Sequence, residues 1–386
     1  MYQSCTHTTH QHCKETPTMK ITDVTVQRYV WPRPKPISNG KYTYVDVSLN
    51  LIHIDTDEGV TGIGWGGGSV SGQGSDLTTV LVDYFRPVLI GQDPFNYRRI
   101  WANMWLPKLV GRRGLSTRVI SGIDIALWDL MGKAVGKSVH QLLGGYRESI
   151  PAYIAGGYYE EGKGLAELAQ EMEENLRLGA KAIKMKIGAV PINQDVERVR
   201  VVRETIGPDV KLLVDANNAY TAHEAIEVAR KMEKYEPFWF EEPVAPDDYR
   251  GHARVARATS IPIASGENEY TRYGFRDLIQ AEGAAILNAD AQILGGITEF
   301  MQVAALSAAE DLVIAPHGAQ EIHVHLVCAI PNGLLLEFYR ETVDPLRMQI
   351  FQEPMLLDAE GNVPVPKRPG LSFTPNYELL QRYRAG

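Results

Sequence analysis

The pattern of apolar and polar positions divides the chain into two parts. From Ile21 onward, short stretches rich in β-branched and aromatic residues predict three strands. These strands are Val24–Val30, Tyr42–Asp55 and Val60–Trp65. The Pro- and Gly-rich segment Trp31–Lys41 lies between the first two and predicts a mobile loop. The wide apolar face of Ser121–Val135 predicts a helix, so we expect residues 19–145 to form an α+β domain.

After Gly145 the pattern changes to short apolar segments that alternate with amphipathic stretches such as Asp195–Ile206 and His223–Tyr235. This alternation predicts a parallel sheet, and eight repeats favour a closed barrel over residues 146–342. The eight predicted strands are Ala152–Ala155, Ala182–Ile187, Lys211–Asp215, Phe238–Glu241, Ile261–Ala264, Ala285–Ala289, Leu312–Ala315 and Leu334–Glu337. The Pro-rich tail, residues 343–386, contains no ninth unit and is expected to pack back on the N-terminal domain.

Three acidic residues occur at even steps along the barrel sequence. Asp215, Glu241 and Glu267 are 26 residues apart, close to the roughly 30 residues of one strand–helix unit, and each follows an apolar run. Carboxylates at the carboxyl ends of three consecutive barrel strands would converge on one point. Oxygen ligands at one point are suited to a hard divalent cation such as Mg2+. A single acid at a strand end is more often a surface residue, but three at even spacing favour a metal site.

The fourth predicted strand ends in two adjacent acids, Glu241 and Glu242. Side chains alternate between the faces of a strand, so only one of the two can point toward the barrel axis. Strand phase alone does not say which one, and the 26-residue spacing selects Glu241.

Two lysines, Lys184 and Lys186, share one face of the second predicted strand. Mutual repulsion and partial burial would lower their pKa values and make one amine available as a base, although two solvated lysines are the ordinary alternative. Asp290 follows the sixth strand and His317 the seventh. A carboxylate beside a histidine fixes its tautomer and raises its basicity, but such a pair is more often structural.

Two further polar residues follow predicted strands. Asn217 lies two residues after Asp215 and on the same face. Glu337 ends the eighth strand among apolar residues, where a carboxylate is costly unless it is partnered or protonated, so it is a candidate hydrogen-bond donor to a developing anion. No lysine occurs between Lys234 and Lys367. The second acid or base opposite Lys186 is therefore expected to be His317.

This ordered set of strand-end residues resembles the enolase superfamily, and specifically its mandelate racemase subgroup. The matching segments are Lys184-Met-Lys186, Asp215-Ala-Asn217, Glu241-Glu-Pro243, Gly266-Glu267-Asn268, Asp290, His317 and Glu337. The resemblance implies a (β/α)7β TIM-type barrel with an α+β capping domain formed by the N-terminal part and the C-terminal tail. It also implies one Mg2+ held by Asp215, Glu241 and Glu267, which is the known chemistry of the superfamily together with a Lys or His base.

The resemblance further implies roles for the remaining residues. Lys186 is expected to act as a base on one face of the substrate, and His317, oriented by Asp290, as acid or base on the other. Lys184 is expected to contact the substrate carboxylate and lower the pKa of Lys186. Glu337 is expected to donate to the second oxygen of an enediolate, and Asn217 to bind substrate.

The implied reaction begins with removal of the proton α to a carboxylate. The favoured outcome is elimination of the β-hydroxyl of an aldonate or aldarate to give a 2-keto-3-deoxy acid. Polar residues of Trp31–Lys41 agree with a sugar-acid substrate better than with an aromatic one. The alternatives are a racemase or epimerase that uses the same Lys/His pair, and, from a different class, a non-catalytic barrel scaffold.

Bulk composition agrees with a globular protein that acts on a small molecule. The chain is 44% hydrophobic and carries a net charge of −8, which argues against nucleic acid and an anionic membrane as partners. No apolar run approaches the roughly 20 residues of a membrane span, and only three cysteines occur, which favours a cytoplasmic location. The family resemblance also suggests a homo-oligomer.

The first 18 residues are polar and rich in Thr and His, which predicts a disordered leader. A zinc cluster is the alternative interpretation of this segment. Its candidate ligands are Cys5, His7, His10, His12 and Cys13.

Overall fold

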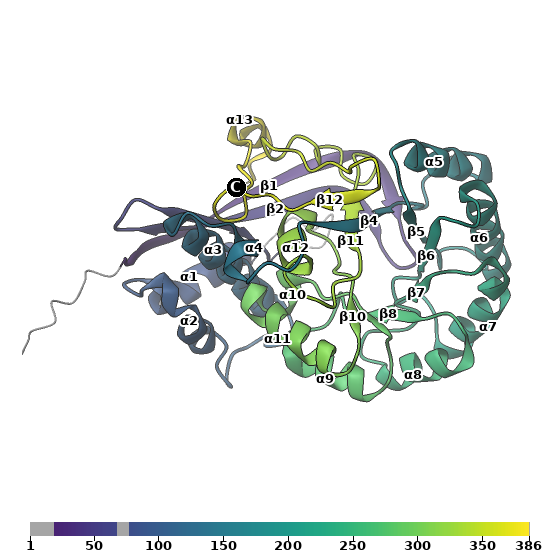
Figure 1. Ribbon diagram of the computed structural model, residues 1–386, viewed down its shortest axis with the longest axis horizontal. Helices are drawn as coiled ribbons and strands as arrows, with labels where there is room; N and C mark the ends of the chain where they lie inside the picture. Colours follow the sequence, from purple (N-terminus) through teal and green to yellow (C-terminus); the bar gives the residue numbers. More distant parts are fainter. Residues whose placement is uncertain (1–18, 68–76, 386) are drawn as a thin grey trace, which may run out of the picture.

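The computed structural model describes residues 19–67 and 77–385. The predicted disordered leader and the alternative zinc cluster lie outside the described residues. Two parts are visible in Figure 1: a capping region with helices α1–α4 at one side, and a ring of helices around a central sheet at the other. In the described part of the chain, no helix is long and apolar enough to cross a membrane.

The N-terminal sheet is antiparallel, with strand order β1-β2-β3. Its strands are β1 (Ile21–Ser38), β2 (Thr43–Thr56) and β3 (Thr61–Trp65). The prediction of a mobile loop over Trp31–Lys41 is wrong for most of that segment, because β1 continues to Ser38 and still pairs with β2 there. Prolines are tolerated in β1 because it is an edge strand, where a missing N–H interrupts no ladder on its free side.

The described part of the capping region also contains five helical segments, of which α1 and α3 contact this sheet. The five segments are α1 (Thr78–Leu89), η1 (Pro94–Asn96), α2 (Tyr97–Met104), α3 (Leu115–Ala134) and α4 (Val139–Leu142). The long helix α3 is buried over most of its length and approaches β3 closely. A Cβ added at Gly64 would lie 2.3 Å from the Gly122 carbonyl oxygen, so this glycine permits the close contact between strand and helix.

Eight parallel strands form the barrel, in the order β4-β5-β6-β7-β8-β9-β10 with β11 on the other side of β4. They are β4 (Ser149–Ala155), β5 (Ala182–Lys186), β6 (Lys211–Asp215), β7 (Trp239–Glu241), β8 (Ile263–Ser265), β9 (Ile286–Leu287), β10 (Val313–Ile314) and β11 (Leu336–Tyr339). A bridge between Ile314 and Gly333 closes the ring between β10 and the segment before β11. The predicted eight-strand barrel is confirmed.

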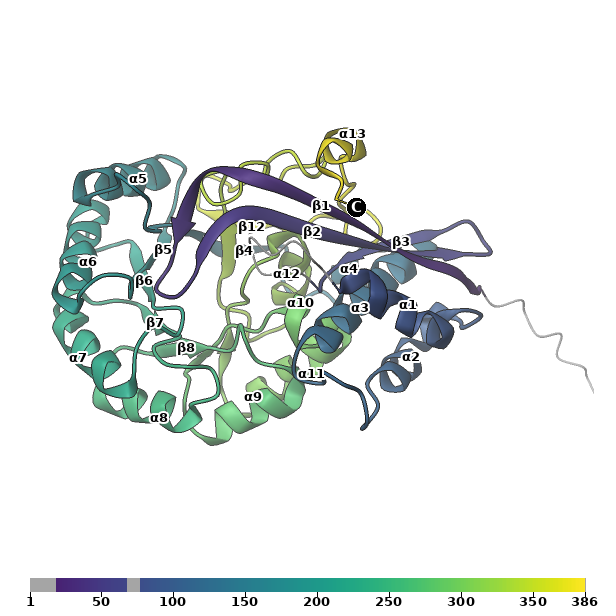
Figure 2. The same ribbon diagram turned by 180° about the vertical axis from the view of Figure 1, so that it is seen from behind.

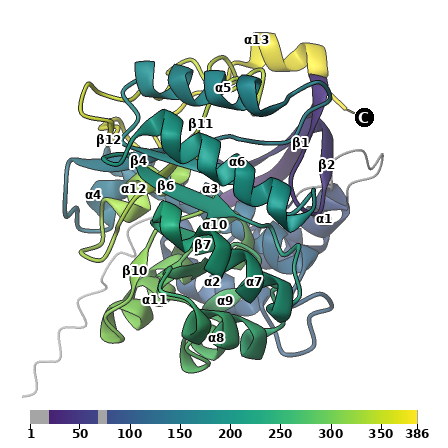
Figure 3. The same cartoon turned by 90° about the vertical axis from the view of Figure 1, so that its right-hand side faces the viewer.

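Helices connect the strands and cover the outside of the barrel (Figures 1 and 3). They are α5 (Leu165–Arg177), α6 (Ile192–Ile206), α7 (Ala222–Met232) with η2 (Glu233–Tyr235), α8 (Tyr249–Ala258), α9 (Thr271–Gln280), α10 (Ala291–Leu294), α11 (Gly296–Ala309) and α12 (Gln320–Val327). The interior of the barrel is filled by one buried cluster of apolar side chains, including Tyr153, Leu213, Trp239 and Ile286. The barrel is thus a packed core whose chemistry must lie at its mouth.

The C-terminal tail contacts both parts of the molecule. It contains β12 (Asn362–Pro364), α13 (Tyr377–Leu380) and η3 (Gln381–Tyr383). Strand β12 pairs antiparallel with β4 of the barrel. On the capping side, Phe351 packs on Trp65 with ring centroids 5.2 Å apart, and the Leu371 N–H donates to Asp129 at 2.7 Å.

The end of the β1–β2 hairpin lies over the mouth of the barrel (Figure 2). Ser38 exchanges two backbone hydrogen bonds with Tyr159 of the loop after β4, at 2.8 and 2.9 Å. Lys41 Nζ donates to the Asn218 carbonyl of the loop after β6 at 3.3 Å. The hairpin therefore forms a cover over the ends of β4–β6.

Candidate active site

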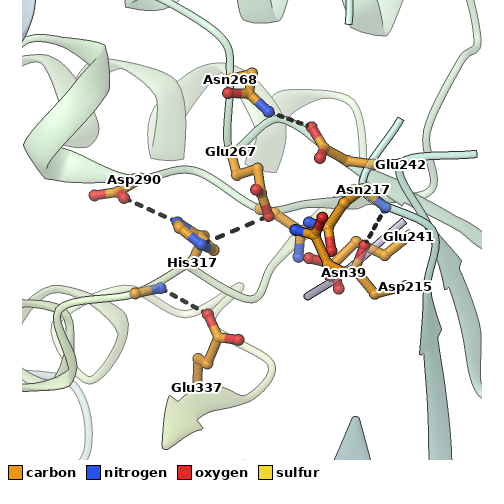
Figure 4. Close-up of polar contacts among 12 residues, drawn as sticks. Asn39, Asp215, Asn217, Glu241, Glu242, Glu267, Asn268, Asp290, His317 and Glu337 are labelled. Atoms are coloured by element: carbon orange, nitrogen blue, oxygen red, sulfur yellow. Dashed lines mark hydrogen bonds and ion pairs between the residues drawn. The ribbon is translucent and has the colours of Figure 1, made fainter. Parts of the chain in front are cut away.

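Three carboxylates meet where the strands of the barrel end. Asp215 is the last residue of β6, Glu241 the last of β7, and Glu267 follows β8 by two residues. One oxygen from each lies within 4.8 Å of the others, and all three residues are buried (Figure 4). The structure thus brings together the three acids selected from their spacing.

Crowding of these acids affects the protonation of Glu241. Burial and the neighbouring charge of Asp215 raise the pKa of Glu241 to about 8. Glu267 Oε2 is buried and has no hydrogen-bond partner among the described residues. Carboxylate oxygens held this close and this far from solvent suit a hard divalent cation, which would supply the missing positive charge. The residues present therefore fit Mg2+.

Glu242 points away from the three carboxylates. Its two carboxylate oxygens accept hydrogen bonds from the side-chain amides of Asn218 at 2.7 Å and Asn268 at 2.8 Å. The choice of Glu241 over Glu242 as the residue facing the barrel axis agrees with this geometry. Trp239 supports Glu241 by donating its indole N–H to Oε2 at 2.9 Å.

Both predicted lysines are buried beside the carboxylates. Lys186 Nζ lies 2.5 Å from Asp215 Oδ2, and Lys184 Nζ lies 3.0 Å from Glu241 Oε1. Burial alone would lower the pKa of Lys186, but Asp215 and then Tyr158 outweigh burial and raise it above its usual range. The expectation of a lowered pKa is wrong for this arrangement, because nearby acids act more strongly on Lys186 than Lys184 does. A cation held by the same acids would oppose their effect.

His317 lies across the carboxylates from the lysines and belongs to the loop after β10. Its Nδ1 is 3.0 Å from Asp290 Oδ2, and its Nε2 is 3.7 Å from Glu267 Oε2 (Figure 4). Burial would lower the pKa of His317, but Glu267 and the bond to Asp290 raise it to about 10. The predicted Asp290–His317 pair is therefore present, and a cation held by Glu267 would oppose part of this rise.

Asp290 has a second histidine neighbour that the sequence analysis did not identify. The Nε2 atom of His323, on α12, lies 3.5 Å from Asp290 Oδ1. The same nitrogen accepts a hydrogen bond from the Ala291 N–H at 2.9 Å. Burial lowers the pKa of His323, so its ring is held neutral. The helical pattern of α12 gave no signal for this contact, because a buried histidine is usually a core residue.

Glu337 is paired with other groups in the structure. Its Oε1 lies 2.7 Å from Lys184 Nζ, and its Oε2 accepts from the Gly318 N–H at 2.7 Å. Burial would raise the pKa of Glu337, but Lys184 and His317 lower it to about 2. Of the two possibilities left open for this acid, partnered or protonated, the structure has the partnered one. In this arrangement Glu337 carries no proton to donate, so its predicted role as a hydrogen-bond donor requires that it be protonated when the substrate is bound.

Asn217 and Lys184 differ in their access to a substrate. Asn217 lies on a left-handed turn with φ of 43°, and its Oδ1 is buried with no hydrogen-bond partner in the described chain. It lines a cavity of about 590 Å³ between the barrel mouth and the hairpin. Lys184 is fully enclosed by protein and does not line that cavity. Contact between Lys184 and a substrate carboxylate would need a rearrangement around Glu337.

The hairpin and α3 supply residues to this cavity beyond those predicted as catalytic. Arg33 and Lys41 were expected only as polar groups of the loop, while Tyr44 and Arg118 were not singled out. Tyr158 packs edge-on against Tyr44 with centroids 6.4 Å apart, and its ring centroid lies 5.2 Å from Lys186 Nζ. These residues carry no spacing signal, because they reach the site through the capping region and the loop after β4.

The chain is similar to two known protein families and to several characterised enzymes. The family described as "Enolase C-terminal domain-like" matches residues 166–379, and the "Mandelate racemase / muconate lactonizing enzyme, N-terminal domain" matches residues 21–144. An arabinonate dehydratase of Saccharolobus solfataricus is 37% identical over 86% of this chain and 89% of its own length. A 3,6-anhydro-α-L-galactonate cycloisomerase of Streptomyces coelicolor is 33% identical over 95% of this chain and 100% of its own.

A solved structure extends the comparison to the metal. A mutant of L-talarate/galactarate dehydratase liganded with Mg and L-glucarate superposes with a TM-score of 0.89, at 29% identity, over 99% of this chain and 96% of that one. Together with the three buried carboxylates, it supports the Mg2+ prediction. Several relatives are named dehydratases of sugar acids, which supports assignment of this chain as a lyase and argues against a non-catalytic scaffold. This chain belongs to the enolase superfamily, within the mandelate racemase and muconate lactonizing enzyme family.

Proposed function

We propose that this protein is a Mg2+-dependent dehydratase of a sugar acid, either an aldonate or an aldarate. It would remove the proton α to the carboxylate and eliminate the β-hydroxyl, which yields a 2-keto-3-deoxy acid. One observation carries this proposal: three buried carboxylates lie between a lysine on one flank and a histidine–carboxylate pair on the other. Relatives named as dehydratases of arabinonate, galactarate and galactonate support it.

The metal would be held by Asp215, Glu241 and Glu267. When bound, Mg2+ supplies positive charge that stabilises the negative charge developing on the substrate carboxylate as the α-proton leaves. Asn217, with its unpaired Oδ1 on the cavity wall, is a proposed substrate contact. Lys184 is proposed to attract the substrate carboxylate after a rearrangement around Glu337, and Glu337 is proposed to donate to the substrate once it has taken up a proton.

Proton transfer is assigned to the two flanking groups. Lys186 in its neutral form accepts the α-proton, and the electrons of that C–H bond form a carbon–carbon double bond. The bond to the β-hydroxyl breaks as His317 gives it a proton, so water leaves, and the resulting enol becomes the 2-keto acid. The raised pKa of His317, about 10, supports its role as the acid, because the ring carries the needed proton at neutral pH.

The proposal is tested by proton exchange in deuterated solvent. With Mg2+ and a panel of aldonic and aldaric acids, at least one acid is expected to exchange its α-proton and form a 2-keto product. Lys186→Ala and His317→Asn are expected to abolish product formation while circular dichroism shows an intact fold. No exchange with any acid of the panel, in folded protein saturated with Mg2+, would contradict the proposal.

A second candidate, racemisation or epimerisation of a 2-hydroxy acid, is favoured by the position of the two groups. Lys186 ends β5 and His317 follows β10, so they approach the carboxylates from different sides of the barrel mouth. One could remove the α-proton and the other return it to the opposite face. The product separates the two candidates: an epimer with the β-hydroxyl retained would favour this alternative, and a 2-keto acid would favour dehydration.

A further inference from the structure

Strand β1 contains a four-residue bulge beside the active-site cavity. Pairing with β2 passes from Pro32 opposite Asp46 to Ile37 opposite Tyr44, so Arg33–Pro36 face only Val45. Bulges change the direction of a strand and redirect its side chains. Arg33 and Lys35 each precede a proline, which restricts them to extended backbone conformations. The bulge thus presents Arg33 on a stiff segment.

The Arg33 side chain lies in the cavity of about 590 Å³ that also contains Asn217 and Glu267. Its Nε is buried and has no hydrogen-bond partner among the described residues. Asp344 attracts Arg33 electrostatically, but it forms no ion pair with Arg33 in the described chain and instead accepts from Trp31 Nε1 at 2.9 Å. A partly buried guanidinium without a carboxylate partner is unfavourable, which points to an anion that comes from outside the protein.

Two other cations of the cavity wall already have partners. Lys41 Nζ donates to the Asn218 carbonyl at 3.3 Å, and Arg118 Nε donates to the Tyr270 hydroxyl at 2.9 Å. Both line the same cavity as Arg33. The cavity wall also carries the carboxylates of Asp46 and Glu267. Among its cations, Arg33 is the one whose buried Nε lacks a partner within residues 19–67 and 77–385.

Phenol groups near Arg33 connect it to the catalytic residues. Tyr158 and Tyr44 both interact electrostatically with the guanidinium, and Tyr158 packs against both Tyr44 and Lys186. Phenol hydroxyls can donate to the same anion that Arg33 binds. Arg33 and Glu267, one of the three clustered carboxylates, thus line one cavity, whose volume is in the range of small-molecule sites.

We propose that Arg33 binds a second carboxylate at the far end of the substrate, so that this enzyme prefers aldarates to aldonates. The inference rests on the proposed function, in which the first carboxylate of the substrate would bind beside the Mg2+ that Asp215, Glu241 and Glu267 would hold. A guanidinium forms two parallel hydrogen bonds with a carboxylate, whereas the primary hydroxyl of an aldonate offers a single neutral acceptor. Arg33 is thus a specificity-determining residue and takes no part in proton transfer.

The test uses acid pairs that differ only at the last carbon, such as galactarate and galactonate. Steady-state kcat/KM with Mg2+ is measured for both acids of each pair. The unmodified enzyme is expected to favour the aldarate by tenfold or more. Arg33→Met is expected to reduce that preference about tenfold to a hundredfold, mainly through KM, because it removes a charge-assisted hydrogen-bond pair. If Arg33→Met does not fold, Arg33→Lys replaces it and is expected to lose part of the preference.

Lys35→Met is the matched control. Lys35 belongs to the same bulge, but its side chain is 65% exposed and pairs with Glu160 at 3.2 Å. This variant loses one positive charge from the same segment and is expected to keep the aldarate preference of the unmodified enzyme.

Two results would overturn the inference and separate it from the proposed function. Equal kcat/KM for both acids of a pair, with Arg33→Met lowering both by the same factor, removes the role of Arg33 but leaves the dehydratase proposal intact. Absence of α-proton exchange with every aldarate and aldonate removes the proposed function, and this inference with it.

Discussion

Glu241 at the end of β7 and the next residue, Glu242, show how the direction of a side chain decides its chemistry. Glu241 faces the carboxylate cluster, whereas Glu242 is held by two asparagine amides. We expect Glu241→Gln to weaken Mg2+ binding by more than about tenfold, because it removes a charged ligand. Glu242→Gln is expected to cause a clearly smaller loss. Calorimetric titration with Mg2+ measures both affinities, and equal losses would show that Glu242 contributes as much as Glu241.

At this same scale, sequence spacing predicts which residues form the site, but it does not predict the direction of their pKa shifts. The 26-residue steps identified Asp215, Glu241 and Glu267, which the structure brings within 4.8 Å. The direction of the pKa shift of Lys186 could not be predicted, because it depends on the short distance from its Nζ to Asp215. Spacing fixes which strand end a residue occupies. The balance between a second lysine and a nearby acid depends on distances between side chains.

At the scale of elements, the β1–β2 hairpin is joined to the barrel at a glycine. A Cβ on Gly40 would lie 2.6 Å from the Ala216 carbonyl oxygen and 2.7 Å from that of Ile187, so any side chain there forces the hairpin away from the barrel mouth. We expect Gly40→Ala to raise KM about tenfold or more, since a misplaced cover costs binding and orientation. The midpoint of thermal unfolding is expected to change little. Kinetics and thermal unfolding measure the two effects.

Gly59→Ala is the contrasting variant for this prediction. Gly59 lies in the turn between β2 and β3 with φ of 74°, and nothing lies within 4 Å of an added Cβ. Its substitution is expected to cost stability by about 1 kcal/mol through backbone strain, with KM unchanged. If Gly40→Ala gave this same pattern, the hairpin would not act as a cover for the substrate.

The hairpin also contains the part of the fold that the sequence pattern does not predict, the extension of β1 from Trp31 to Ser38. Alternating strand and helix patterns identified the eight barrel strands, because each is a short apolar run between amphipathic helices. The pattern predicts a loop over Trp31–Lys41 because prolines usually end strands, and the edge position of β1 together with its bulge allows them here. Which strand lies at the edge of a sheet depends on the tertiary fold, so it cannot be inferred from the local sequence pattern. Tyr44, which this hairpin brings to the cavity, therefore has no signal in the sequence pattern, and Arg33 is indicated only as a polar group of the predicted loop.

At the scale of the whole molecule, buried histidines make stability depend on pH. Burial lowers the pKa of His252 on α8 and of His325 on α12 to about 4, compared with about 6.5 in an unfolded chain. Between these values the unfolded state binds more protons, so the free energy of unfolding falls as pH drops from about 6.5 toward 4. Each histidine is expected to contribute about 2 to 3 kcal/mol to this fall.

Urea unfolding at pH 7.5 and pH 4.5 measures this contribution. For His252→Gln, the difference in unfolding free energy between the two pH values is expected to be smaller than in the unmodified protein by about 2 kcal/mol. The comparison between pH values cancels any stability that the substitution costs at neutral pH. Identical differences in both proteins would mean that His252 titrates normally in the folded state.

The contacts of the C-terminal tail have a consequence for biosynthesis. Trp31 donates to Asp344, Trp65 packs on Phe351, Asp129 accepts from Leu371, and the Ala385 N–H donates to the Arg28 carbonyl. These contacts join the first third of the polypeptide to its last segment. A ribosome therefore synthesises Asp344 313 residues after its partner Trp31. The order of synthesis and the order of assembly differ in this protein, because Trp31 and Trp65 can make these contacts only after Asp344 and Phe351 have emerged.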